Sequence, residues 1–206
     1  MRTFTEMQKA QESLQKVKGI VEKFLNDETK YNFASRAGDG KPESVFQEDL
    51  VKYLPDEYEG EVPFCVKTSE QGIRHTLNED EFRYDLKVTV SKYEQCLIEL
   101  KYDEEKDDGS STNPISEAEV IRDIYKLQSW KNKHNNDLCL AVFATNKASH
   151  WENFTSITSG EHEITYDGKK EKFTLSYPYA VQWKESKKNG KYKYCIIQVD
   201  IFRLQK

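Results

Sequence analysis

Three charged residues, Asp85, Glu99 and Lys101, have the types and the spacing of a metal-dependent hydrolytic site. They fall in two strand-like segments, Phe82–Val90 and Tyr93–Tyr102. Side chains at positions i and i+2 of a strand share a face, so Glu99 and Lys101 point together, and Asp85 reaches them if the strands pair. Two carboxylates suit a hard divalent cation, and a neighbouring ammonium can serve the attacking water. The pattern predicts metal-assisted hydrolysis of a phosphodiester.

A plain ion pair between Glu99 and Lys101 on an exposed strand is the competing interpretation. The run from Cys96 to Leu100 is otherwise apolar, which is typical of a central strand. Charges are seldom buried in such a strand without a partner or a role, because their desolvation is costly. Asp85 also interrupts a comparable strand. Both observations favour the metal-dependent hydrolytic site over a plain ion pair.

Helical periodicity predicts two helices in the first quarter of the chain. The first runs from Phe4 to Leu25, with apolar side chains close to the helical period. We interpret it as packed on the domain, with a dimer-forming helix as the alternative. The second runs from Pro42 to Leu54, because proline is favoured at the first helical position. We expect Phe46, Leu50 and Leu54 to form its buried stripe.

A third helix is predicted from Ser116 to about Lys133, where Ser116 and Glu119 have the spacing of a capping box. The nearly apolar run Asp137–Ala144 predicts a strand buried on both faces. Val62–Lys67 is expected to be the first strand of the sheet. Two polar segments are expected to be loops, Asn32–Lys41 and Asp103–Asn113.

The last part of the chain changes character. Two hairpin turns are indicated, at Asp167-Gly168 and at Asn189-Gly190, between aromatic-rich alternating segments. We interpret residues 160–206 as a β-rich extension of an α/β core at 42–146, with an N-terminal helix within 1–30. No linker suggests independent domains, so a single domain, 1–206, is expected.

Composition limits the classes of protein that fit. Of the 206 residues, 33% are charged, and the formal net charge is −5. No apolar run is long enough to span a membrane, and the start lacks a signal peptide, so a soluble cytoplasmic protein is expected. The acidic balance argues against a tight nonspecific DNA binder, without excluding a nuclease. The cysteines lack zinc-ligand spacing and are expected to be reduced core thiols: Cys65, Cys96, Cys139 and Cys195.

These motifs resemble the PD-(D/E)xK nuclease superfamily, which has the restriction-endonuclease-like fold. Asp85 matches the first motif acid, and Glu99-Leu100-Lys101 matches the second motif. The expected order of helix, three strands, helix and strand over Pro42–Asn146 matches the family core. Tyr84 stands where the family name has proline. The resemblance implies an α/β fold with a central mixed β-sheet flanked by helices, plus the β-rich C-terminal extension.

The resemblance also implies the roles of the site residues. Asp85 and Glu99 would bind Mg²⁺, for which Mn²⁺ would substitute, with the Leu100 carbonyl as a further ligand. Lys101 would serve the attacking water. Family members often place another carboxylate on the helix before the sheet, for which we prefer Glu43 and keep Glu48 as the alternative. For a supporting residue on the third helix the options are Asp123, Lys126 and Gln128, with Lys126 first among them; a solvated helix face is the favoured interpretation of each.

The activity expected on this basis is Mg²⁺-dependent hydrolysis of DNA by a restriction-type endonuclease, or by a repair or antiphage nuclease, of bacterial or phage origin. DNA would be the partner, and a homodimer is the option raised by the N-terminal helix. The alternative from another class is a noncatalytic module that keeps the nuclease fold and joins a larger complex.

Overall fold

A mixed β-sheet lies at the centre of the computed structural model. The structure describes residues 4–26, 42–56, 58–61, 84–90, 95–103, 116–147, 152, 154–166, 168–186 and 192–199. The helices are α1 (Phe4–Asn26), α3 (Pro42–Tyr53) and α4 (Glu117–Lys133). The strands are β1 (Glu59–Glu61), β2 (Leu86–Thr89), β3 (Gln95–Asp103), β4 (Leu138–Thr145), β5 (Ser156–Ile157), β6 (Gly160–Tyr166), β7 (Lys169–Leu175), β8 (Tyr179–Ala180), β9 (Lys184–Glu185) and β10 (Lys193–Gln198).

Within the described residues, the central sheet has six strands in the order β1-β2-β3-β4-β10-β9. Strands β1, β2 and β3 form an antiparallel meander. Strand β4 then pairs parallel with β3, and α4 makes the crossover between them. Parallel neighbours need such a long connection, which usually contains a helix. The expectation of an α/β fold with a central mixed sheet flanked by helices is therefore confirmed.

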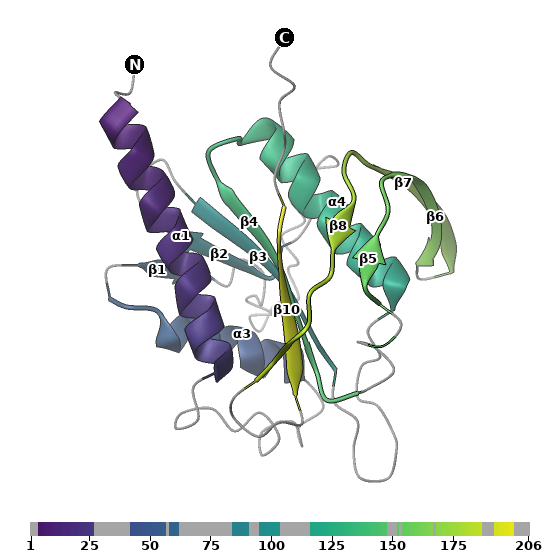
Figure 1. Ribbon diagram of the computed structural model, residues 1–206, viewed down its shortest axis with the longest axis horizontal. Coiled ribbons are helices and arrows are strands. Elements are labelled where there is room, and N and C mark those ends of the chain that lie inside the picture. The colour runs from purple at the N-terminus through teal and green to yellow at the C-terminus, as the bar shows by residue number, and fades with distance from the viewer. Residues whose placement is uncertain are drawn as a thin grey trace, which may run out of the picture.

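Helices cover the two faces of this sheet (Figure 1). The first face packs on α1 and α3, and the second packs on α4, with the β6–β7 hairpin lying beyond α4. Strand β4 is buried along its whole length, as the apolar run predicted. Its side chains alternate between the two cores, so Val142 faces α1 and α3 whereas Phe143 faces α4. Burial of each large apolar side chain stabilises the fold by about 1.5–3 kcal/mol.

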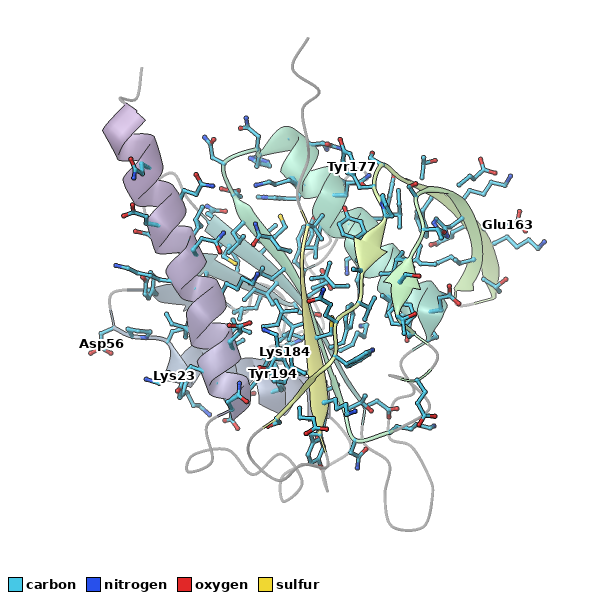
Figure 2. The ribbon with its side chains drawn as sticks, in the orientation of Figure 1. Lys23, Asp56, Glu163, Tyr177, Lys184 and Tyr194 are labelled. Atoms are coloured by element: carbon cyan, nitrogen blue, oxygen red, sulfur yellow. The ribbon has the colours of Figure 1, made fainter. Side chains whose placement is uncertain are left out.

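Helix α1 packs on the domain, as the preferred interpretation of its periodicity predicted. Its buried side chains are Leu14, Val17, Val21, Phe24 and Leu25. Polar contacts tie its C-terminal part to the last strands of the sheet. Lys184 Nζ lies 2.7 Å from Glu22 Oε1, and Asn26 Nδ2 donates a 2.9 Å hydrogen bond to the Tyr194 hydroxyl. Figure 2 shows Lys184 and Tyr194 beside this end of α1.

Helices α3 and α4 follow their sequence signals closely. In α3, the predicted stripe of Phe46, Leu50 and Leu54 is buried. Ser116 caps α4 by accepting a 3.2 Å hydrogen bond from the Glu119 backbone N–H, and the Glu119 side chain accepts one from the Ser116 N–H in return. This reciprocal capping box fixes the first turn of α4.

Several predictions fall outside the described residues. These are the strand at Val62–Lys67, the loop at Asn32–Lys41, most of the loop at Asp103–Asn113, Cys65 and the turn at Asn189-Gly190. Strand β1, just before Val62, was not expected. The strand predicted at Phe82–Val90 is shorter in the structure, where β2 contains only Leu86–Thr89.

The C-terminal β-rich residues differ from the expectation in one respect. Gly168 adopts a φ of 72° in the β6–β7 hairpin, a conformation that favours glycine, so this turn is confirmed. However, β10 is not part of an appended extension, because it pairs antiparallel with β4 within the central sheet. Its alternating side chains add to both cores, which a separate extension would not do; for example, Tyr194 faces α1 and Cys195 faces α4.

The three described cysteines, Cys96, Cys139 and Cys195, are free and buried. This agrees with the expected core thiols. None of the helices in the described ranges is both long and apolar enough to cross a membrane.

Candidate functional site

Strand pairing brings Asp85 next to Glu99. The β2–β3 register ends with Leu86 opposite Ile98, and Asp85 directly precedes β2 at the end of this pairing nearest Glu99. Asp85 is half-buried, and its Oδ2 accepts a 2.8 Å hydrogen bond from the Leu100 backbone N–H. This bond fixes the Asp85 carboxylate at the edge of β3 where β2 begins.

Alternation along β3 separates the charged side chains from the apolar ones. Ile98 and Leu100 join the core under α1 and α3, whereas Leu97 joins the core under α4. Glu99 and Lys101 share the face of Leu97, so they project toward α4. Glu99 is buried, and the Lys101 side chain is 21% exposed. The structure thus brings Glu99 and Lys101 to one face, with the Asp85 carboxylate at the adjoining edge of β3.

Helix α4 adds two charged side chains to this face, Asp123 and Lys126. Lys126 Nζ lies 2.7 Å from Glu99 Oε2 and 3.0 Å from Asp123 Oδ1. The other oxygen of Asp123, Oδ2, lies 3.4 Å from Lys101 Nζ. Glu99, Lys126, Asp123 and Lys101 therefore form a chain of alternating charges between β3 and α4, which begins beside Asp85. We call these five residues the charge cluster.

Tyr84 contacts the charge cluster through Lys126. Its hydroxyl donates a 3.1 Å hydrogen bond to the Lys126 backbone carbonyl, and the Lys126 ammonium lies 6.0 Å from the centre of the Tyr84 ring. The Tyr84 ring also packs edge-on against Trp130, farther along α4. The residue before Asp85 thus anchors the helix that carries Asp123 and Lys126.

Burial and neighbouring charges shift the ionisation of this cluster. Burial raises the pKa of Glu99 well above its ordinary value, the Asp85 carboxylate raises it further, and Lys126 opposes both. Burial alone would lower the pKa of Lys126, but the carboxylates of Glu99, Asp123 and Asp85 outweigh it and raise that pKa. Lys126 is therefore a permanent cation at neutral pH, and Glu99 has an unusually strong tendency to hold a proton.

The favoured interpretation of the α4 polar residues as a solvated face is wrong, because Asp123, Lys126 and Gln128 are all buried. Gln128 has a structural partner on β7 instead of a place in the cluster. Its amide nitrogen donates to the Thr174 carbonyl at 3.3 Å, and its carbonyl oxygen accepts from the Ser176 N–H at 2.9 Å. Sequence reasoning named Asp123 only as an option. The available signal was its position, three residues before Lys126 and next to the buried Ile124, on the apolar side of α4.

The helix carboxylates of α3 are not brought to the cluster by any described contact. Glu48 is exposed and lies 3.9 Å from Lys52 on the same helix. Glu43 begins α3, and its side chain lies outside the described residues. The buried side chains Phe46 and Leu50 pack α3 on the face of the sheet opposite to Glu99.

Asp85 and Glu99 are the residues of the cluster that could hold a divalent cation. Glu99 Oε1 is buried and accepts no hydrogen bond from the described part of the chain, so it offers a free acceptor. The Leu100 carbonyl points to the same strand edge as its N–H, which faces Asp85. Among the described residues, no three His, Cys, Asp or Glu side chains are grouped to hold a metal. Mg²⁺ is commonly held by one or two carboxylates and several waters, so a third carboxylate is not required of a Mg²⁺ site.

Comparison of the chain with protein-family models, with curated proteins and with solved structures found no match.

Proposed function

We propose that the chain is a Mg²⁺-dependent deoxyribonuclease of the PD-(D/E)xK type, which hydrolyses DNA phosphodiester bonds as a restriction-type, repair or antiphage endonuclease. The observation that carries this proposal is the convergence of Asp85, Glu99 and Lys101 at one edge of β3, where Asp85 accepts the N–H of Leu100, the residue between Glu99 and Lys101. The order α3, β1, β2, β3, α4, β4, with β3 parallel to β4, adds support because the family core has the same sequence of elements.

In this proposal, Asp85 and Glu99 hold the metal together with the Leu100 carbonyl. When bound there, the metal would supply a nucleophilic water of lowered pKa and would offset the charge of the phosphate. Asp85 keeps its orientation through the Leu100 N–H. Lys101 serves the attacking water, either by orienting it or by stabilising the charge that develops on the phosphate. Asp123 holds the Lys101 ammonium in position from 3.4 Å away. The role of Glu43, the preferred helix carboxylate, as an outer ligand stays a prediction of the sequence, because α3 packs on the face of the sheet opposite to Glu99.

The test is cleavage of supercoiled, linear and single-stranded DNA with and without Mn²⁺. We expect wild type to cleave at least one substrate only when the metal is present, and Lys101→Ala to abolish that cleavage. Lys133→Ala is the matched control, because Lys133 is an exposed lysine of α4 outside the cluster. Full activity in Lys101→Ala would contradict the assignment.

A noncatalytic binding module is the second candidate, and one observation favours it. Lys126 already neutralises Glu99 through a buried contact of 2.7 Å, as expected of a site that needs no metal. Calorimetric titration with Mn²⁺ separates the two functions. A nuclease gives a binding signal that Asp85→Asn removes, whereas a binding module gives no signal in either protein.

A further inference from the structure

In the charge cluster, the Lys126 ammonium is the cation that contacts the Glu99 carboxylate. Its ammonium lies 2.7 Å from Glu99 Oε2 and 3.0 Å from Asp123 Oδ1, and its side chain is 8% exposed. A divalent metal on Asp85 and Glu99 would compete with this ammonium for the Glu99 carboxylate. Two cations so close together in a buried site repel each other strongly, because little water screens them.

The net charge of the cluster indicates how strongly the Lys126 ammonium competes with a divalent metal. Asp85, Glu99 and Asp123 supply three carboxylates, against the two ammoniums of Lys101 and Lys126. With all five ionised, the cluster carries one net negative charge. Without Lys126 it would carry two, which doubles the net charge that attracts a divalent ion.

The structure also provides a second partner for Lys126. When the ammonium leaves Glu99, Asp123 Oδ1 remains beside it. The backbone of Lys126 stays fixed meanwhile by the Tyr84 hydroxyl, so only the side chain has to move. Glu99 can therefore be released without exposing an unpaired buried ammonium, which would be costly.

We propose that Lys126 is a built-in counter-cation of Glu99, which a divalent metal must displace toward Asp123, so that Lys126 sets the metal concentration at which the site fills. This inference rests on the proposed function, because it concerns the same metal site. It makes Lys126 a regulator of metal occupancy and leaves the chemistry to the other residues.

Calorimetric titration of the full chain with MnCl₂ tests the proposal. The proteins are wild type, Lys126→Met, Lys126→Gln and the control Lys133→Met. We expect both Lys126 variants to bind Mn²⁺ at least tenfold more tightly than wild type, and the control to match wild type. Lys126→Gln keeps a hydrogen-bond donor near Glu99, so it decides the matter if Lys126→Met does not fold. Equal or weaker binding by Lys126→Gln would overturn the proposal.

Parallel DNA cleavage assays on the wild type separate this inference from the proposed function. If wild type cleaves DNA with Mn²⁺ but Lys126→Gln binds the ion no more tightly, the counter-cation role fails alone. If Lys126→Gln binds more tightly and no protein cleaves any DNA substrate, the nuclease function fails and the counter-cation role stands. If none of the proteins binds Mn²⁺, both are overturned.

Discussion

Glu99 and Lys126 meet across the interface between β3 and α4, with Glu99 Oε2 and Lys126 Nζ 2.7 Å apart and both side chains buried. Breaking one side of a buried ion pair leaves an uncompensated charge, which costs about 3–5 kcal/mol. We therefore expect Lys126→Met to lower the free energy of unfolding by about this amount, measured by urea denaturation without metal. The exposed Lys133→Met should change it by less than about 0.5 kcal/mol.

The double variant Glu99→Met/Lys126→Met should recover much of this loss, because replacing both partners by apolar groups of similar size removes the desolvation cost. A double variant as unstable as the sum of the two single variants would show that the contact contributes little, and would argue that Glu99 and Lys126 act separately.

Substitution of Asp85 by asparagine should leave the stability of the fold almost unchanged but should abolish Mn²⁺ binding. Asp85→Asn keeps an oxygen that accepts the Leu100 N–H, whereas Asp85→Ala removes it and costs about 1 kcal/mol. We expect the two variants to differ in stability by roughly that amount and both to lose Mn²⁺ binding. Urea denaturation and calorimetry on the same samples provide the measurements. Retained Mn²⁺ binding in both would exclude Asp85 as a ligand.

Glu99 should give the stability a pH dependence of a definite sign. Because the folded state raises the pKa of Glu99, the folded protein binds this proton more tightly than the unfolded chain does. The contribution of Glu99 is most favourable below the ordinary carboxyl pKa of about 4.5, and it is lost as pH rises from there through the raised pKa. Lys126 stays charged throughout this range, because its pKa is also raised.

The measurement is the free energy of unfolding of wild type and Glu99→Gln between pH 4.5 and 8. Glutamine cannot lose a proton in this range, so the stability of wild type relative to Glu99→Gln should fall as pH rises. A difference that grows with pH would mean that Glu99 is stabilised as a carboxylate, contrary to the effect of its burial.

The capping box of α4 should also be measurable. Ser116→Ala removes the hydroxyl that accepts the Glu119 N–H, and loss of such a cap costs about 0.5–2 kcal/mol. Thermal unfolding should show the loss, whereas Mn²⁺ affinity should remain within twofold, because Asp123 and Lys126 lie beyond the first turn of the helix. A larger drop in affinity would show that the first turn positions the cluster.

Local signals in the sequence were enough to predict most of the described helices and strands of the core. Period-two alternation placed Glu99 and Lys101 on one face, and helical period identified the buried stripe of α3. The capping box located the start of α4. Each of these depends on neighbours within a few residues, where propensity and patterning act directly.

Long-range pairing was harder to predict. The place of β10 beside β4 depends on contacts between segments far apart in the chain, and no local pattern encodes such a pairing. For the same reason, Asp123 and Lys126 could be named only as options. Their partners Glu99 and Lys101 lie on β3. The residues of α4 that contact them could therefore be chosen only once the position of α4, in the crossover between β3 and β4, was known.

The position of β10 has a consequence for how the protein is made. Strand β4 is almost entirely apolar, and among the described strands its edge away from β3 is paired with β10, which follows it in the chain after β5, β6, β7, β8 and β9. During synthesis on the ribosome, that edge is unpaired until β10 has emerged, and an open apolar edge invites association with other nascent chains. We therefore expect shortened products that stop before Lys193 to aggregate, even though they retain every residue of the charge cluster.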